Sequence, residues 1–181
     1  MGLTKQEKAL LLKIARKSIE AGLAGGEMSP PEIESSTLKE KMGAFVTLKK
    51  RDRLRGCIGF IEGRKPLYET VEEMAQAAAF RDPRFRPVRE DELRDLDIEI
   101  SALTPLRQIH DVDEIEVGRH GLYLVKGNHS GLLLPQVATE YNWDRMTFLK
   151  ETCMKAGLPE DAWKDTDAQI FIFSATVFSE G

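Results

Sequence analysis

Glycine occurs twice within four positions of segment 54–59, whose sequence is Leu-Arg-Gly-Cys-Ile-Gly. Because glycine has no side chain to bury and costs backbone entropy, a strand built only for packing rarely contains it so often. Gly56 and Gly59 therefore indicate a bulge, or a close approach by a ligand or by another backbone. Cys57 lies between the glycines, next but one to Arg55, and nearby positive charge favours the reactive thiolate. The segment is a candidate site.

The direction in which these side chains point depends on the regularity of the strand. In a regular strand Arg55 and Cys57 share one face, whereas Leu54, Ile58 and Phe60 point into the core. On this interpretation Cys57 is a candidate nucleophile beside a guanidinium. The alternative is that Cys57 is a small buried hydrophobe, which is the commonest fate of a free cysteine.

A second cluster, residues 81–87, has the sequence Arg-Asp-Pro-Arg-Phe-Arg-Pro. Guanidiniums suit the recognition of a carboxylate or phosphate, and Asp82 is placed to orient one of them. Alternatively, Asp82 caps a helix end, the arginines are solvated and Phe85 is anchored. We expect an anion site on one concave surface that Cys57 shares. The residues expected to form it are Arg55, Gly56, Gly59, Arg81, Asp82, Arg84 and Arg86.

Composition and net charge indicate which kinds of binding partner the protein can be expected to have. The 181 residues are 41% hydrophobic and 31% charged, as in an ordinary soluble protein with a real core. The formal net charge of −4 gives no reason to expect nucleic acid or an anionic membrane as a partner. Charge is uneven, with +5 in segment 49–65 and −8 in segment 90–116. We interpret most of these side chains as two solvated faces of opposite sign.

The cysteines and the N-terminus favour a cytoplasmic protein with reduced thiols. Cys57 and Cys153 match no disulfide framework or metal-ligand spacing, and the N-terminus does not resemble a secretory signal. No apolar run approaches membrane-spanning length. Cys153 is expected on a packed helix face. The histidines are His110, His120 and His129, and they are scattered in the sequence. Their spacing does not indicate a metal site, and none is an evident base for Cys57.

Hydrophobic periodicity predicts a mixture of helices and hairpins. A capping box at Thr4 and Glu7 opens the first helix. Expected helices are 4–21, 36–42, 66–79, 135–141 and 144–156; expected strands are 44–48, 54–60, 96–103, 121–126, 131–134 and 168–178. The last strand is apolar on both faces, which indicates an interior position. The pattern favours an α+β fold with one mainly antiparallel sheet, in a single domain 1–181. We expect a large lobe and a small lobe, the latter built from the N-terminal helix and residues 22–43.

Several motifs together resemble the AMMECR-type domain, called AmmeMemoRadiSam system protein A in prokaryotes. They are segment 54–59, Asp82-Pro83-Arg84-Phe85, LDIEISAL at 96–103, LLLPQVA at 132–138 and the series from Trp143 to Trp163. The resemblance covers nearly the whole chain. It implies an α+β fold with a large and a small lobe, and an active or binding site at the glycine-cysteine motif. It also implies Memo-type and radical SAM proteins as partners in a pathway of redox or modification chemistry.

Two functions are compatible with these residues. The first is an enzyme or substrate-presenting component that uses Cys57, with the arginines around an anionic small molecule or modified residue. The second is a non-catalytic interaction module whose same cleft binds a partner's peptide or acidic surface. The sequence offers a candidate nucleophile without a convincing base, which favours binding. The reaction, the substrate and any cofactor are not indicated by the residues.

Overall fold

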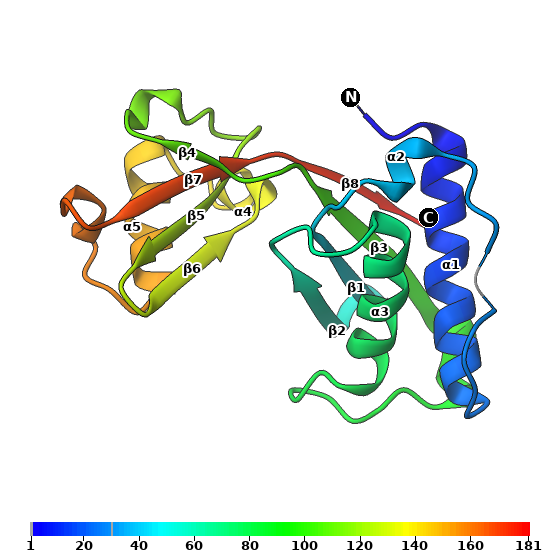
Figure 1. The fold of residues 1–181 in the computed structure, drawn as a ribbon. Coiled ribbons are helices and arrows are strands. Elements are labelled where there is room, and N and C mark those ends of the chain that lie inside the picture. Colours follow the sequence, from blue (N-terminus) through cyan, green and yellow to red (C-terminus); the bar gives the residue numbers. More distant parts are fainter. Residues whose placement is uncertain (1, 30) are drawn as a thin grey trace. The chain divides into compact units, whose positions relative to one another are not determined.

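The structure, a computed structural model, describes residues 2–29 and 31–181. Its contacts divide the chain into two units (Figure 1). The larger unit contains Met1–Leu103 and Thr176–Gly181, and the smaller unit contains Thr104–Ala175. The sequence predicts a small lobe from the N-terminal helix and residues 22–43, but these residues belong to the larger unit. The α+β class is confirmed.

The larger unit is built on a four-stranded sheet in the order β2-β1-β3-β8. Its strands are β1 (Ala44–Lys50), β2 (Arg53–Phe60), β3 (Leu96–Leu103) and β8 (Ala175–Ser179). The strand β1 pairs antiparallel with both β2 and β3. Since β2 has only one neighbour, it is an edge strand, and the backbone groups on its outer side need other partners.

Helices cover one face of this sheet (Figure 1). They are α1 (Lys5–Leu23), α2 (Ser36–Lys39) and α3 (Leu67–Phe80). A 3₁₀ helix, η1 (Glu90–Asp95), directly precedes β3 in the chain. The predicted capping box is present, because Thr4 Oγ1 accepts from the Glu7 amide and the Glu7 carboxylate accepts from the Thr4 amide. Alternate residues Ala44, Val46 and Leu48 of β1 are buried against the helices. The candidate site residues all belong to this unit.

The smaller unit has its own four-stranded sheet in the order β4-β7-β5-β6, and every pairing in it is antiparallel. Its strands are β4 (Arg107–Ile109), β5 (Gly121–Lys126), β6 (His129–Leu133) and β7 (Gln169–Phe173). Its helices are α4 (Pro135–Glu140) and α5 (Arg145–Lys155), with 3₁₀ helices η2 (Val112–Glu114) and η3 (Ala162–Lys164). A separate apolar cluster, which includes Phe148 and Ile172, forms its core.

The expected single strand 168–178 is wrong, and so is the expected single sheet. The segment forms β7 and β8, which belong to different sheets on either side of Ser174. Ser174 belongs to neither strand: its amide donates to Thr104 Oγ1, and its carbonyl accepts from the Thr104 amide. The strand β7 is interior, whereas β8 is at an edge. An apolar run cannot reveal this change, because both parts bury side chains. None of the helices within the described residues is long and apolar enough to span a membrane.

Gly56 is explained by the packing of β2 against α3. A Cβ atom at Gly56 would lie 2.2 Å from the carbonyl oxygen of Ala78, so the helix backbone occupies the place of a side chain. At Gly59 a Cβ atom would lie 2.4 Å from the ring of Phe45, its partner on β1. The close approach that the glycines indicate is therefore present, by a backbone at Gly56 and by a ring at Gly59, and the register of β2 with β1 also contains a bulge next to Gly56.

We therefore expect Gly56→Ala to destabilise the protein by about 1–3 kcal/mol, because β2 and α3 must separate to admit a methyl group. Gly26→Ala is the matched control, since a Cβ atom there meets no atom within 4 Å. The measurement is the free energy of unfolding in denaturant. Equal stability of the two variants would contradict this explanation of Gly56.

Candidate binding site

A one-residue bulge in β2 determines which way the motif's side chains point. Leu48 pairs with Gly56 and Lys49 pairs with Leu54, so Arg55 is the additional residue. A bulge shifts the alternation by one residue. Leu54 therefore lies on the face of Lys49 rather than in the core, and the residue is 45% exposed. The expectation that Leu54 points into the core is wrong. Phe60 pairs with Ala44 and so lies on the predicted face, but at the end of the strand it is 39% exposed.

Asp82 and Arg84 provide the missing neighbour of the edge strand at Cys57. The Cys57 amide donates to Asp82 Oδ2 at 2.9 Å, and Arg84 Nη2 donates to the Cys57 carbonyl at 3.2 Å. The two side chains also bind each other, since Arg84 Nε donates to Asp82 Oδ1 at 3.0 Å and Nη2 donates to Oδ2 at 2.8 Å. The pair satisfies both outward backbone groups of one strand residue, as a further strand would.

This role commits the Asp82 carboxylate to its ionised form. It is buried, yet the hydrogen bond from Arg84 holds the pKa of Asp82 well below its usual range, assisted by the amides of Cys57 and Arg84. A carboxylate with so low a pKa is a weak base at neutral pH. Asp82 therefore orients Arg84, as the sequence suggests, and positions the backbone of Cys57.

The only side-chain hydrogen bond of the Cys57 thiol among the described residues is with a threonine hydroxyl. Its Sγ is 3.2 Å from Thr47 Oγ1 on the paired strand, and the residue is half-buried. The three histidines belong to the smaller unit. Cys153 is fully buried on α5, as expected, and burial raises the pKa of its thiol. The larger unit supplies Cys57 with no histidine base within its described residues.

Glu92 of η1 is the centre of a group of ionic hydrogen bonds. Its carboxylate accepts from Arg55 Nε at 3.1 Å, Arg55 Nη2 at 2.9 Å, Lys50 Nζ at 2.9 Å and the Arg89 amide at 3.1 Å. Arg55 also donates to the carbonyl of Arg86 at 2.9 Å. The side chains of Arg55 and Glu92 are each only 15% exposed. The hydrogen bond from Arg55 is the main cause that lowers the pKa of Glu92 to about 2.

These contacts build two adjoining hollows, of about 480 and about 330 Å³, that share Lys50 and Arg55. We call them together the basic hollow. The first is lined by Lys50, Arg51, Arg53, Leu54 and Arg55, and the second by Lys50, Arg55, Arg86, Pro87, Arg89, Asp91 and Glu92. The lining has six basic and two acidic side chains, so its net charge is +4 in a chain whose net charge is −4.

The basic side chains of the hollow differ in their partners. Lys50 and Arg55 bind Glu92, Arg51 lies 3.7 Å from Asp95 and Arg89 binds Asp91. Arg53 and Arg86 have no ion-pair partner in the part of the chain that the structure describes. These two exposed guanidiniums keep their donors available for a ligand.

The structure brings some of the predicted site residues together. Arg55 and Arg86 line the basic hollow, whereas Cys57 does not. Arg84 binds the Cys57 backbone, and Arg81 lines a different groove, along α3. Gly56 and Gly59 face protein atoms. The hollow is also lined by residues that no sequence motif singles out, namely Lys50, Arg53, Arg89 and Glu92. The described residues contain no cluster of three His, Cys, Asp or Glu side chains arranged to hold a metal ion.

Known proteins are similar to this chain over nearly its whole length. The model of the AMMECR1 family matches residues 12–178. Protein MK0488 of Methanopyrus kandleri is 46% identical, over 98% of this chain and 90% of its own length. A protein of Thermococcus onnurineus is 48% identical, over 94% of this chain and 88% of its own length. The crystal structure of the uncharacterized protein PH0010 from Pyrococcus horikoshii has a TM-score of 0.86 at 45% identity, covering 94% of this chain and 90% of that one.

The chain therefore belongs to the AMMECR1 family, which confirms the resemblance seen in its motifs.

We expect Glu92→Gln to destabilise the protein by about 1.5–3 kcal/mol at neutral pH, because the hydrogen bonds from Arg55 and Lys50 lose a charged acceptor. The folded state lowers the pKa of Glu92 from 4.5 to about 2, so its stabilisation is complete above about pH 4.5 and is lost as the pH falls toward about 2. The difference in unfolding free energy between wild type and variant should shrink over that interval.

The measurement is denaturant unfolding at several pH values, with Glu90→Gln as the control. Glu90 is exposed and lies in the same 3₁₀ helix. A deficit in Glu92→Gln that stays constant as the pH falls would show that the carboxylate charge is not what holds these segments together.

Proposed function

We propose that this protein is a cytoplasmic binding protein that recognises an anionic small molecule, or an anionic modified residue, in the basic hollow. The observation that carries this proposal is that the arginines of the hollow differ in whether they have an acidic partner. Glu92 fixes Arg55 in place, while Arg53 and Arg86 keep guanidiniums without an acidic partner in the described chain. Fixed positive groups beside available donors are what a preorganised anion site requires.

The local backbone supports such preorganisation. The turn between β1 and β2 consists of Arg51 and Asp52, with positive φ values of 50° and 62°, as in a tight two-residue hairpin turn. The loop that presents Arg86 is fastened at both ends, because Val88 N donates to the Ala79 carbonyl and Asp82 binds the Cys57 amide. Guanidiniums held in this way favour a planar or tetrahedral oxyanion, such as a carboxylate or a phosphate.

Binding is supported over thiol chemistry by the surroundings of Cys57. The thiol lies outside the basic hollow and contacts Thr47, while its backbone is held by Asp82 and Arg84. A nucleophilic cysteine needs an adjacent base or a site where its thiolate is favoured and can reach the substrate. In this arrangement Cys57 acts as a strand residue whose backbone anchors the 82–84 segment.

An interaction module is the second candidate, and the exposed side chain of Leu54 favours it. Leu54 lines the basic hollow among Lys50, Arg51 and Arg53, so an apolar contact lies within a positively charged rim. A partner with an acidic surface is complementary to this arrangement. The Memo-type and radical SAM proteins that the family resemblance implies are the candidate partners.

The test is calorimetric titration with inorganic pyrophosphate at low ionic strength. We expect wild type to bind, and Arg53→Gln combined with Arg86→Gln to lose about ten- to a hundredfold in affinity, because two charge-assisted contacts are removed. Cys57→Ser should bind like wild type. The double variant should keep the wild-type unfolding free energy, since neither arginine forms an ion pair with any residue that the structure describes.

Arg64→Gln combined with Arg119→Gln is the matched control, because it removes the same charge from exposed positions outside the hollow. An equal loss in this control would mean that only net charge matters and would contradict a site. Failure of wild type to bind pyrophosphate, with binding of a purified Memo-type or radical SAM protein that requires Arg53 and Arg86, would replace the small-anion proposal with the interaction module.

A further inference from the structure

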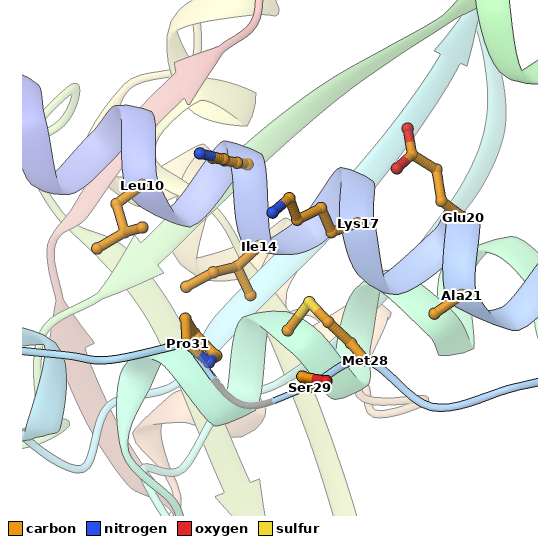
Figure 2. A pocket seen from close by; sticks show the side chains of 9 residues that line it. Leu10, Ile14, Lys17, Glu20, Ala21, Met28, Ser29 and Pro31 are labelled. Carbon is orange, nitrogen blue, oxygen red and sulfur yellow. The ribbon is translucent and has the colours of Figure 1, made fainter.

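A groove of about 480 Å³ lies along α1 in the larger unit, away from the basic hollow (Figure 2). Leu10 and Ile14 of the helix point toward Met28 and Pro31 across the groove. Its remaining lining residues are Lys13, Lys17, Glu20, Ala21 and Ser29. The volume is within the range of small-molecule sites, and the floor is apolar.

Two lysines on the same side of α1 border this apolar floor. Lys13 and Lys17 are four residues apart and exposed, so their side chains leave the same face of the helix. The ion pairs of the described residues include neither of them, whereas Arg16 on the same helix binds Glu180. Like charges at this spacing destabilise a helix slightly, and an anion between them relieves the repulsion. Glu20, one turn beyond Lys17, gives the groove a negative end that an anionic group avoids.

This combination of an apolar floor and unpaired cations defines the ligand class. We propose that the groove binds a single-chain amphiphile with a carboxylate head group, its chain on the partly exposed Leu10, Met28 and Pro31 and its carboxylate at Lys13 and Lys17. Lysine side chains cover apolar surface with their stems while their charges remain in water, so they can receive a head group at the rim. The lining has no aromatic ring for a base or sugar to stack on.

The test uses dodecanoate below its micelle concentration, with binding measured by calorimetry. We expect wild type to bind dodecanoate, and Lys13→Gln combined with Lys17→Gln to weaken it about tenfold, as removal of two exposed charge contacts predicts. Neutral 1-dodecanol should bind both proteins equally, because it uses only the floor. Ala21→Phe should abolish binding of both ligands, because its ring fills the groove.

Lys5→Gln combined with Lys39→Gln is the matched control, since both residues are exposed and lie outside the groove. It should bind dodecanoate like wild type. The proposal is overturned if wild type does not bind dodecanoate, if the control loses as much affinity as the groove variant, or if the protein binds anionic phospholipid vesicles but no monomeric dodecanoate. Pyrophosphate binding at the basic hollow should be the same in all these variants, which separates the two proposals.

Discussion

The carboxylate of Glu92 is the interaction on which the basic hollow depends. It joins the end of β1 through Lys50, the bulge of β2 through Arg55 and the start of η1 through the Arg89 amide. The hairpin residues Lys50 and Arg55 lie 42 and 37 positions before Glu92 in the sequence, so this carboxylate joins two segments that the chain itself keeps apart. Replacing a largely buried ionic acceptor leaves two cations facing each other, so the hollow and the local fold share one determinant.

The glycine-cysteine motif, residues 54–59, has a structural role. Gly56 admits the backbone of α3, the bulge at Arg55 turns its guanidinium toward Glu92, and Asp82 with Arg84 completes the hydrogen bonds of the strand edge. Each feature contributes to holding the 81–89 loop beside the hairpin. The most distinctive residues of the sequence therefore support the site, whereas the ligand-facing residues we propose, Arg53 and Arg86, lie outside the motif.

The sequence predicts the elements whose periodicity is strong, and it predicts the site only in part. The helix at α3, the strands β3 and β5 and the capping box at Thr4 follow from local patterns that the structure reproduces. The two glycines indicate that a bulge is one alternative, but its position at Arg55 depends on the register with β1, which no local pattern gives. Glu92 is one of ten acids in segment 90–116, and only the fold selects it. The change of sheet at Ser174 is equally a tertiary property.

The central claim is that arginines of one small region divide into structural and ligand-binding members. The direct measurement is the NMR spectrum of the arginine Nε–H groups during a pyrophosphate titration. The account predicts slow hydrogen exchange and nearly constant shifts for Arg55 and Arg84, whose Nε atoms donate to Glu92 and Asp82, and large shifts for Arg53 and Arg86. Shifts of Arg55 and Arg84 as large as those of Arg53 and Arg86, with equally fast exchange, would contradict it.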